Sequence, residues 1–149
     1  MDVVVVYESK TGTTRRAALA MGDEFFTRGV RCRTYPAKGV DPAAIAAADL
    51  VILGSWVDGL FVVGQRPGGR RNLERALGLM GGTDGTTLRG KRVAVYCTYA
   101  VAPGRTLSKM EALATDLGAE VVGGLAIRRD RISEGAATFV EAVADLSTV

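Results

Sequence analysis

The run of four valines and a tyrosine at residues 3–7 is the feature that most constrains how this chain can fold. The run is apolar throughout and mostly β-branched, which is typical of a strand buried on both faces. Strands of that kind occur in parallel sheets whose two faces are covered by helices. The run therefore predicts an α/β fold.

The rest of the chain repeats this alternation of apolar runs and amphipathic stretches. Further strands are predicted at residues 30–35, 50–53, 92–97 and 121–127, and helices at residues 13–28, 72–80, 105–117 and 134–146, with a short helix from Asp41 and Pro42. Residues 54–64 are predicted as a loop and residues 81–90 as a connector. Five strands alternating with helices predict a three-layer sandwich around a five-stranded parallel sheet, in a single domain over residues 1–149. The polar residues 30–35 are expected at a sheet edge, and two common strand orders stay open.

The absence of histidine removes several classes of active site. Ser-His-Asp and Cys-His nucleophilic sites, and histidine-based zinc or iron sites, cannot be built from this chain. The two cysteines, Cys32 and Cys97, lie in apolar, strand-like surroundings and are expected to be reduced, buried thiols. We therefore expect no metal site and no catalytic side chain, and reactive chemistry would have to come from a cofactor.

The chain is basic, with a formal net charge of +3 and an isoelectric point of about 9.1. Arginines gather in residues 66–75 and again in residues 128–131. Such clusters indicate a solvated surface, an acidic partner, or a site for the phosphates of a nucleotide such as NAD(P)H. We find no nucleic-acid-binding motif. Because no apolar run is long enough to span a membrane and no leader is seen before the first strand, a cytoplasmic location is expected. The expected oligomeric state is a monomer or a homodimer.

The segment directly after the first predicted strand carries four hydroxyl groups and a glycine: Ser9, Lys10, Thr11, Gly12, Thr13 and Thr14. The glycine lets the backbone turn tightly around a ligand, and the following helix offers unpaired N–H groups and a partial positive charge. Together these features predict an anion site that needs no arginine. Hydroxyl clusters also cap helices without binding a ligand, and that alternative stays open.

This segment resembles the FMN-phosphate signature of the flavodoxin family. The signature is an apolar strand end, an aromatic residue, Ser/Thr-x-Thr-Gly-x-Thr and a downstream alanine, which residues 5–14 and Ala18 match. The resemblance implies the strand order 2-1-3-4-5, and the short-chain type because residues 121–127 carry no insertion. It also implies that the hydroxyls hydrogen-bond the phosphate. The FMN-binding residues implied here are Ser9, Lys10, Thr11, Gly12, Thr13 and Thr14.

The resemblance places two further segments beside the flavin ring. They are Ser55, Trp56, Val57, Asp58 and Gly59 after the third strand, and Thr98, Tyr99, Ala100, Val101 and Gly104 after the fourth. Both depart from the family pattern, because Asp58 and Val101 stand where a stacking aromatic residue is usual. Trp56 and Tyr99 are the aromatic residues that would cover the ring instead, or else pack beside their own loops.

The resemblance thus implies an FMN-binding protein that carries electrons between redox partners. Two alternatives stay open: an NAD(P)H-dependent FMN or quinone reductase, which is a flavin-dependent oxidoreductase, and a binding module of the same fold that has lost flavin. Because flavodoxins are usually acidic, the basic charge of this chain favours an acidic partner or a nucleotide. Dinucleotide dehydrogenases and P-loop ATPases are less favoured, because their glycine-rich phosphate loops are missing from this sequence.

Overall fold

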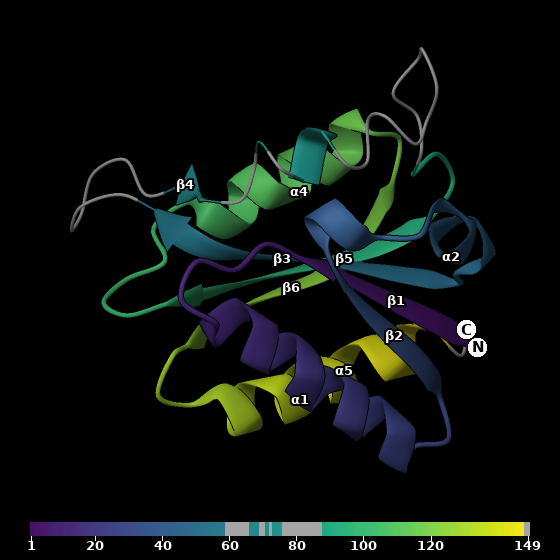
Figure 1. The fold of residues 1–149 in the computed structure, drawn as a ribbon, viewed down its shortest axis with the longest axis horizontal. Helices are drawn as coiled ribbons and strands as arrows, with labels where there is room; N and C mark the ends of the chain where they lie inside the picture. Colours follow the sequence, from purple (N-terminus) through teal and green to yellow (C-terminus); the bar gives the residue numbers. More distant parts are fainter. Residues whose placement is uncertain (59–65, 69–70, 72, 76–87, 148–149) are drawn as a thin grey trace.

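The computed structural model describes residues 1–58, 66–68, 71, 73–75 and 88–147. Within these residues a parallel sheet lies between two layers of helices (Figure 1). Its parallel strands are β1 (Asp2–Tyr7), β2 (Arg31–Pro36), β3 (Leu50–Asp58), β5 (Arg92–Tyr99) and β6 (Glu120–Arg128). They follow the order β2-β1-β3-β5-β6. Because β5 and β6 are the fourth and fifth predicted strands, this confirms the predicted order 2-1-3-4-5 and the edge position of β2.

The helices cover the sheet in pairs. Helices α1 (Thr13–Thr27) and α5 (Ile132–Ser147) lie on one face, while α2 (Pro42–Ala47) and α4 (Thr106–Asp116) lie on the other (Figure 1). A short 3-10 helix, η1 (Ala37–Gly39), follows β2. This is the three-layer arrangement that the alternating pattern predicts.

The valine run forms β1, and its alternate side chains enter two different cores. Val3 and Val5 pack in the cluster under α1 and α5, whereas Val4 and Val6 pack in the cluster under α2 and α4. All four are nearly inaccessible to solvent. Alternate residues of a strand point to opposite faces, so a strand covered on both faces needs apolar residues at every position.

The predicted loop at residues 54–64 is wrong for its first five residues, because β3 continues to Asp58. The parallel ladder with β5 also continues, pairing Ser55 with Cys97 and Trp56 with Thr98. Beyond that point Val57 pairs with Pro67 of β4 (Arg66–Pro67), a two-residue antiparallel strand inside the arginine-rich segment. Glycine and polar residues suggested a loop, but the neighbouring strands supply hydrogen-bond partners for this backbone.

Part of the sequence interpretation lies outside the described residues. Of the helix predicted at residues 72–80 the structure describes residues 73–75, which are helical, and of the connector at residues 81–90 it describes residues 88–90, which form a turn. Leu73 and Leu88 are buried in the core under α2 and α4. Gly59 lies outside the described residues. None of the described helices has the length and apolar character that a bilayer crossing requires.

Candidate functional site

The predicted phosphate loop joins β1 to α1 at the carboxyl end of the sheet. Gly12 adopts a left-handed conformation, with φ of 94°, and stands directly before the first residue of α1. The Ser9 hydroxyl accepts a hydrogen bond from the Gly12 N–H at 3.0 Å, which closes the turn. The side chain of Thr11 is exposed and that of Thr13 is half-buried, and neither hydroxyl has a partner among the described residues. The loop therefore presents two free hydroxyls beside the helix N-terminus.

Thr14 has a different environment from the other three hydroxyl residues of the loop. Its side chain is buried, and its Oγ1 lies 2.8 Å from Oγ1 of Thr98, whose side chain is also buried. The hydroxyl that the resemblance assigns to phosphate is therefore hydrogen-bonded to the end of β5. This contact joins the first and third predicted ligand segments directly.

Tyr96 forms a second contact between β5 and the start of α1. Its phenol donates a hydrogen bond to the carbonyl oxygen of Thr14 at 2.9 Å, inside the core. To reach α1 the ring crosses β3 at Gly54, where an added Cβ would lie only 2.1 Å from Cζ of the ring. A glycine at position 54 is therefore needed for sterics, since a side chain there would displace Tyr96. The sequence analysis did not identify Tyr96 as part of the site.

Trp56 belongs to the β3–β4 hairpin beside the loop. Its ring is half-buried and packs against Gly68, where an added Cβ would lie 2.3 Å from Cε2. The Gly68 N–H donates to the Trp56 carbonyl at 2.9 Å, and the Lys10 ammonium lies 5.1 Å from the centre of the Trp56 ring. A cation at this distance from an indole is attracted to its π face. Lys10 and Trp56, predicted in separate segments, are thus brought together.

The other predicted residues of the β3 segment serve the hairpin. Ser55 is buried, and its hydroxyl donates to the Trp56 carbonyl at 2.9 Å. Val57 is half-buried and pairs with Pro67. Asp58 forms an ion pair with Arg66, with Oδ2 and NH2 3.3 Å apart. These residues lie in a strand and are held by pairing with neighbouring strands, so they do not form the loop that the sequence predicts.

The third predicted segment follows β5 at residues 99–104. Tyr99 is half-buried, and its carbonyl accepts a hydrogen bond from the Arg129 N–H at 2.9 Å. Ala100 and Val101 are exposed, and Val101 has 76% of its surface accessible. Gly104 turns the chain into α4 with φ of 54°. The segment therefore presents one large apolar side chain to solvent next to the strand ends.

A pocket of about 300 Å³ opens beside the phosphate loop, on the side of β2. Two cations line it that the sequence analysis did not include, Arg15 from the first turn of α1 and Lys38 from η1. Both are exposed and have no partner among the described residues. The pocket beside the loop is therefore lined by an arginine and a lysine as well as by loop residues. The full lining is Tyr7, Glu8, Ser9, Gly12, Arg15, Pro36 and Lys38.

A larger hollow, of about 550 Å³, lies at the amino ends of the strands, and its lining includes Met1 and Arg92. One of the two cationic side chains that line it, Lys91, already donates hydrogen bonds from its ammonium to the carbonyls of Ala46 at 2.6 Å and Ala48 at 2.9 Å. We favour the smaller pocket because parallel α/β sheets bind ligands beyond the carboxyl ends of their strands.

Two thiols and one phenol have raised pKa values. Burial raises the pKa of both the Cys97 and the Cys32 thiols from 9.0 to about 12. Burial, with a smaller contribution from the charge of Tyr7, raises the pKa of the Tyr96 phenol well above its usual range. Both cysteines are free; Cys97 is buried as expected, but Cys32, on the edge strand, is partly exposed. Among the described residues no cluster of three acidic, cysteine or histidine side chains could hold a metal ion.

Known structures share this arrangement of elements. Flavodoxin 2 from Bacillus cereus matches with a TM-score of 0.75 and 24% identity, over 98% of this chain and 99% of that one. A short-chain flavodoxin associated with a bacterial microcompartment matches with a TM-score of 0.72 and 18% identity, over 99% of both chains. Rubredoxin:oxygen oxidoreductase from Desulfovibrio gigas matches with a TM-score of 0.69 and 14% identity, over 99% of this chain and 36% of that one.

The chain therefore has the flavodoxin-like fold, with the length of the short-chain type. No family model matches its sequence, and no curated protein matches it either. At these identities the likeness establishes the fold, and function has to be argued from the residues themselves.

Proposed function

We propose that this chain binds FMN at the carboxyl edge of its sheet and transfers electrons between redox partners. The observation that carries the proposal is the loop of residues 9–14. It combines a left-handed glycine, the N-terminus of a 15-residue helix and the free hydroxyls of Thr11 and Thr13. Backbone N–H groups and hydroxyls at a helix start favour a phosphate dianion.

The residues present fit the phosphate end of FMN. An added Cβ at Gly12 would meet nothing within 4 Å, so the space outside the turn is open to a ligand. Arg15 and Lys38 line the adjoining pocket and lower the electrostatic cost of holding a dianion. Thr14 holds the loop against β5 through its bond to Thr98, so that the N–H groups keep their direction.

The residues present fit the ring end less fully. Trp56 and Tyr99 stand on the two segments that would border the ring, but the Trp56 ring already packs on Gly68 and Lys10. When bound, FMN supplies the one- and two-electron chemistry for which no side chain here is suited. The protein's part is to bind the phosphate, orient the ring and present its edge to a partner.

A second candidate function is a module of the same fold that binds no flavin. It is favoured by the hydroxyls of Ser9 and Thr14, which are hydrogen-bonded within the protein, and by Val101 in place of a stacking aromatic residue. An NAD(P)H-dependent FMN or quinone reductase is a variant of the main proposal, in which the basic surface receives a nucleotide. Turnover of NADPH with a quinone acceptor separates this variant from a simple electron carrier.

Titration with FMN and with riboflavin decides between the two candidates. The main proposal expects bound FMN to lose its fluorescence and to bind more tightly than riboflavin, which lacks the phosphate. A module without flavin binds neither at micromolar concentration. If the two ligands bind equally tightly, the phosphate loop makes no contribution and the assignment of residues 9–14 is wrong.

A further inference from the structure

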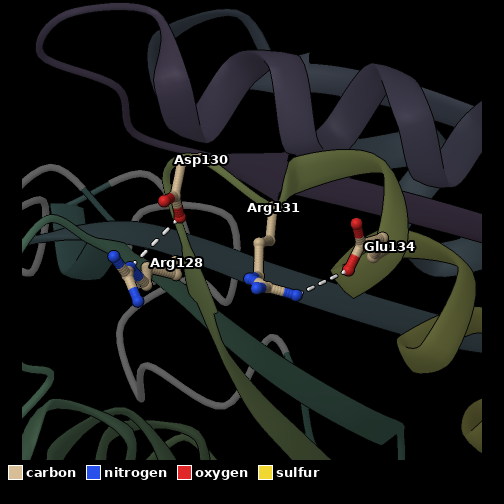
Figure 2. Close-up of polar contacts among 4 residues, drawn as sticks. All are labelled: Arg128, Asp130, Arg131 and Glu134. Atoms are coloured by element: carbon tan, nitrogen blue, oxygen red, sulfur yellow. Dashed lines mark hydrogen bonds and ion pairs between the residues drawn. The ribbon is translucent and has the colours of Figure 1, made fainter.

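Three exposed arginines lie at the junction of β6 and α5: Arg128, Arg129 and Arg131. Figure 2 shows two ion pairs there: Arg128 Nε lies 3.1 Å from Asp130 Oδ1, and Arg131 NH1 lies 3.1 Å from Glu134 Oε2. All four side chains are more than half exposed. Exposed pairs of this kind contribute little to stability, so their carboxylates are easily replaced by others.

Arg129 is adjacent to Arg128 in the chain, is exposed, and has no carboxylate partner among the described residues. Its backbone N–H donates to the Tyr99 carbonyl, which places the arginine turn beside residues 99–104. Arg105 follows that segment, is exposed, and likewise has no side-chain partner in the described part of the chain. Val101, with 76% of its surface exposed, lies between Tyr99 and Arg105 in the chain. Protein–protein interfaces combine an apolar centre with a polar, solvent-accessible rim, and an exposed valine near exposed arginines matches that combination.

We propose that this surface, which we call the arginine face and define as Val101, Arg105, Arg128, Arg129 and Arg131, docks an acidic protein partner. The inference rests on the proposed function, because residues 99–104 are one of the segments that would border the flavin. The face adds a partner of stated charge to that function. Its cations are spread over two exposed segments, whereas the pocket that suits a small anion lies on the β2 side of the sheet.

Charge complementarity is the physical basis of this docking. The unpaired guanidiniums of Arg105 and Arg129 attract carboxylates from a distance and raise the association rate. Partner carboxylates then substitute for Asp130 and Glu134, which exchanges one exposed ion pair for another at little cost. Both effects weaken as salt is added.

The test is a titration of the protein with two probes, an acidic ferredoxin and a basic c-type cytochrome, at low and high ionic strength. We expect binding to the ferredoxin only, and weaker binding at high salt. The double variant Arg105→Glu with Arg129→Glu should weaken ferredoxin binding by about tenfold or more. A matched control, Arg28→Glu with Arg89→Glu, changes the net charge equally at the far edge of the sheet and should leave most of the affinity.

Three results would overturn the proposal. In the first, the arginine variant binds the ferredoxin as tightly as the parent chain does. In the second, the control variant loses as much affinity as the arginine variant, which would show that only net charge matters. In the third, a single-stranded oligonucleotide titrated in parallel binds more tightly than the ferredoxin and loses affinity in the arginine variant. FMN titration of the same variants keeps the two proposals apart, because a chain that docks the ferredoxin without binding FMN refutes only the flavin assignment.

Discussion

The Tyr96 phenol and the Thr14 carbonyl oxygen are joined by a buried 2.9 Å hydrogen bond, although the two residues are 82 positions apart in the chain. The bond ties the centre of the sheet to the first turn of α1. Together with the contact between the Thr14 and Thr98 hydroxyls, it holds the end of the loop of residues 9–14 against the sheet. The loop is therefore fixed by tertiary contacts as well as by its own turn.

Removing the phenol should loosen this junction. Tyr96→Phe leaves the Thr14 carbonyl buried without that partner, and we expect the free energy of unfolding to fall by about 1–2 kcal/mol. Urea unfolding measures the loss. Tyr35→Phe is the matched control, since Tyr35 is half-buried and its hydroxyl has no partner among the described residues. Equal stability of the two variants would show that the Tyr96 bond contributes nothing.

Gly54 should tolerate no side chain. An added Cβ would lie 2.1–2.4 Å from two ring carbons and the hydroxyl oxygen of Tyr96, whose side chain is fully buried. Gly54→Ala is therefore expected to destabilise the fold by about 1–3 kcal/mol. Gly22→Ala in α1 is the control, because its new Cβ would meet only Thr34 at an ordinary 3.8 Å. There the gain in helix propensity predicts a small increase in stability, and the two thermal midpoints should move in opposite directions.

These contacts also show what the sequence can and cannot predict. The double burial of β1 follows from a local pattern, because every residue of the valine run has its own apolar environment. The strand order does not follow from the pattern, which leaves two orders open; the family resemblance implies the order that the structure has. The loop at residues 9–14 is identified by residues that are adjacent in the chain. Tyr96 reads simply as one more apolar residue of a buried strand, since its role depends on a glycine in the neighbouring strand.

The same limit explains the errors around the site. Residues 54–58 look like a loop in isolation, and only pairing with β5 and with Pro67 makes them a strand. Arg15 and Lys38 line the same pocket because β2, which precedes Lys38, pairs with β1, which precedes Arg15. Residue composition does not predict which strands are neighbours, so the sequence did not bring these two residues together. Thr14 fits the phosphate signature by its type, but its burial directs its hydroxyl to Thr98.

The free hydroxyls of the loop provide a direct test of phosphate binding. Thr11→Ala with Thr13→Ala should weaken FMN binding by at least about tenfold, because hydrogen bonds to a charged group are the stronger kind. Riboflavin affinity should stay the same, since that ligand carries no phosphate. Thr115→Ala, an exposed threonine near the end of α4, is the control for loss of a hydroxyl. A parallel loss for both ligands in fluorescence titrations would contradict the phosphate role.

Stability should fall at high pH because of the buried thiol of Cys97. Burial raises its pKa from 9.0 to about 12 in the folded chain. The unfolded chain therefore loses this proton first, and the contribution to stability is complete below pH 9 and is lost progressively as the pH rises toward 12. Cys97→Ala removes the effect, so its free energy of unfolding should decline less steeply than that of the parent above pH 9. Identical slopes in urea unfolding at pH 8 to 11 would contradict the burial of the thiol.

An aromatic residue at position 101 should strengthen flavin binding. Val101 is 76% exposed, so a larger side chain there meets no packed neighbour and the fold should keep its stability. If residues 99–104 border the flavin ring, Val101→Trp adds a stacking surface worth about 0.5–1.5 kcal/mol, which raises affinity several-fold. The gain should be the same for FMN and riboflavin because both carry the ring, in contrast to the threonine variants. Phe26, which is also exposed but lies near the far end of α1, gives the control Phe26→Trp. Unchanged affinity for both ligands in the Val101 variant would place the ring away from this segment.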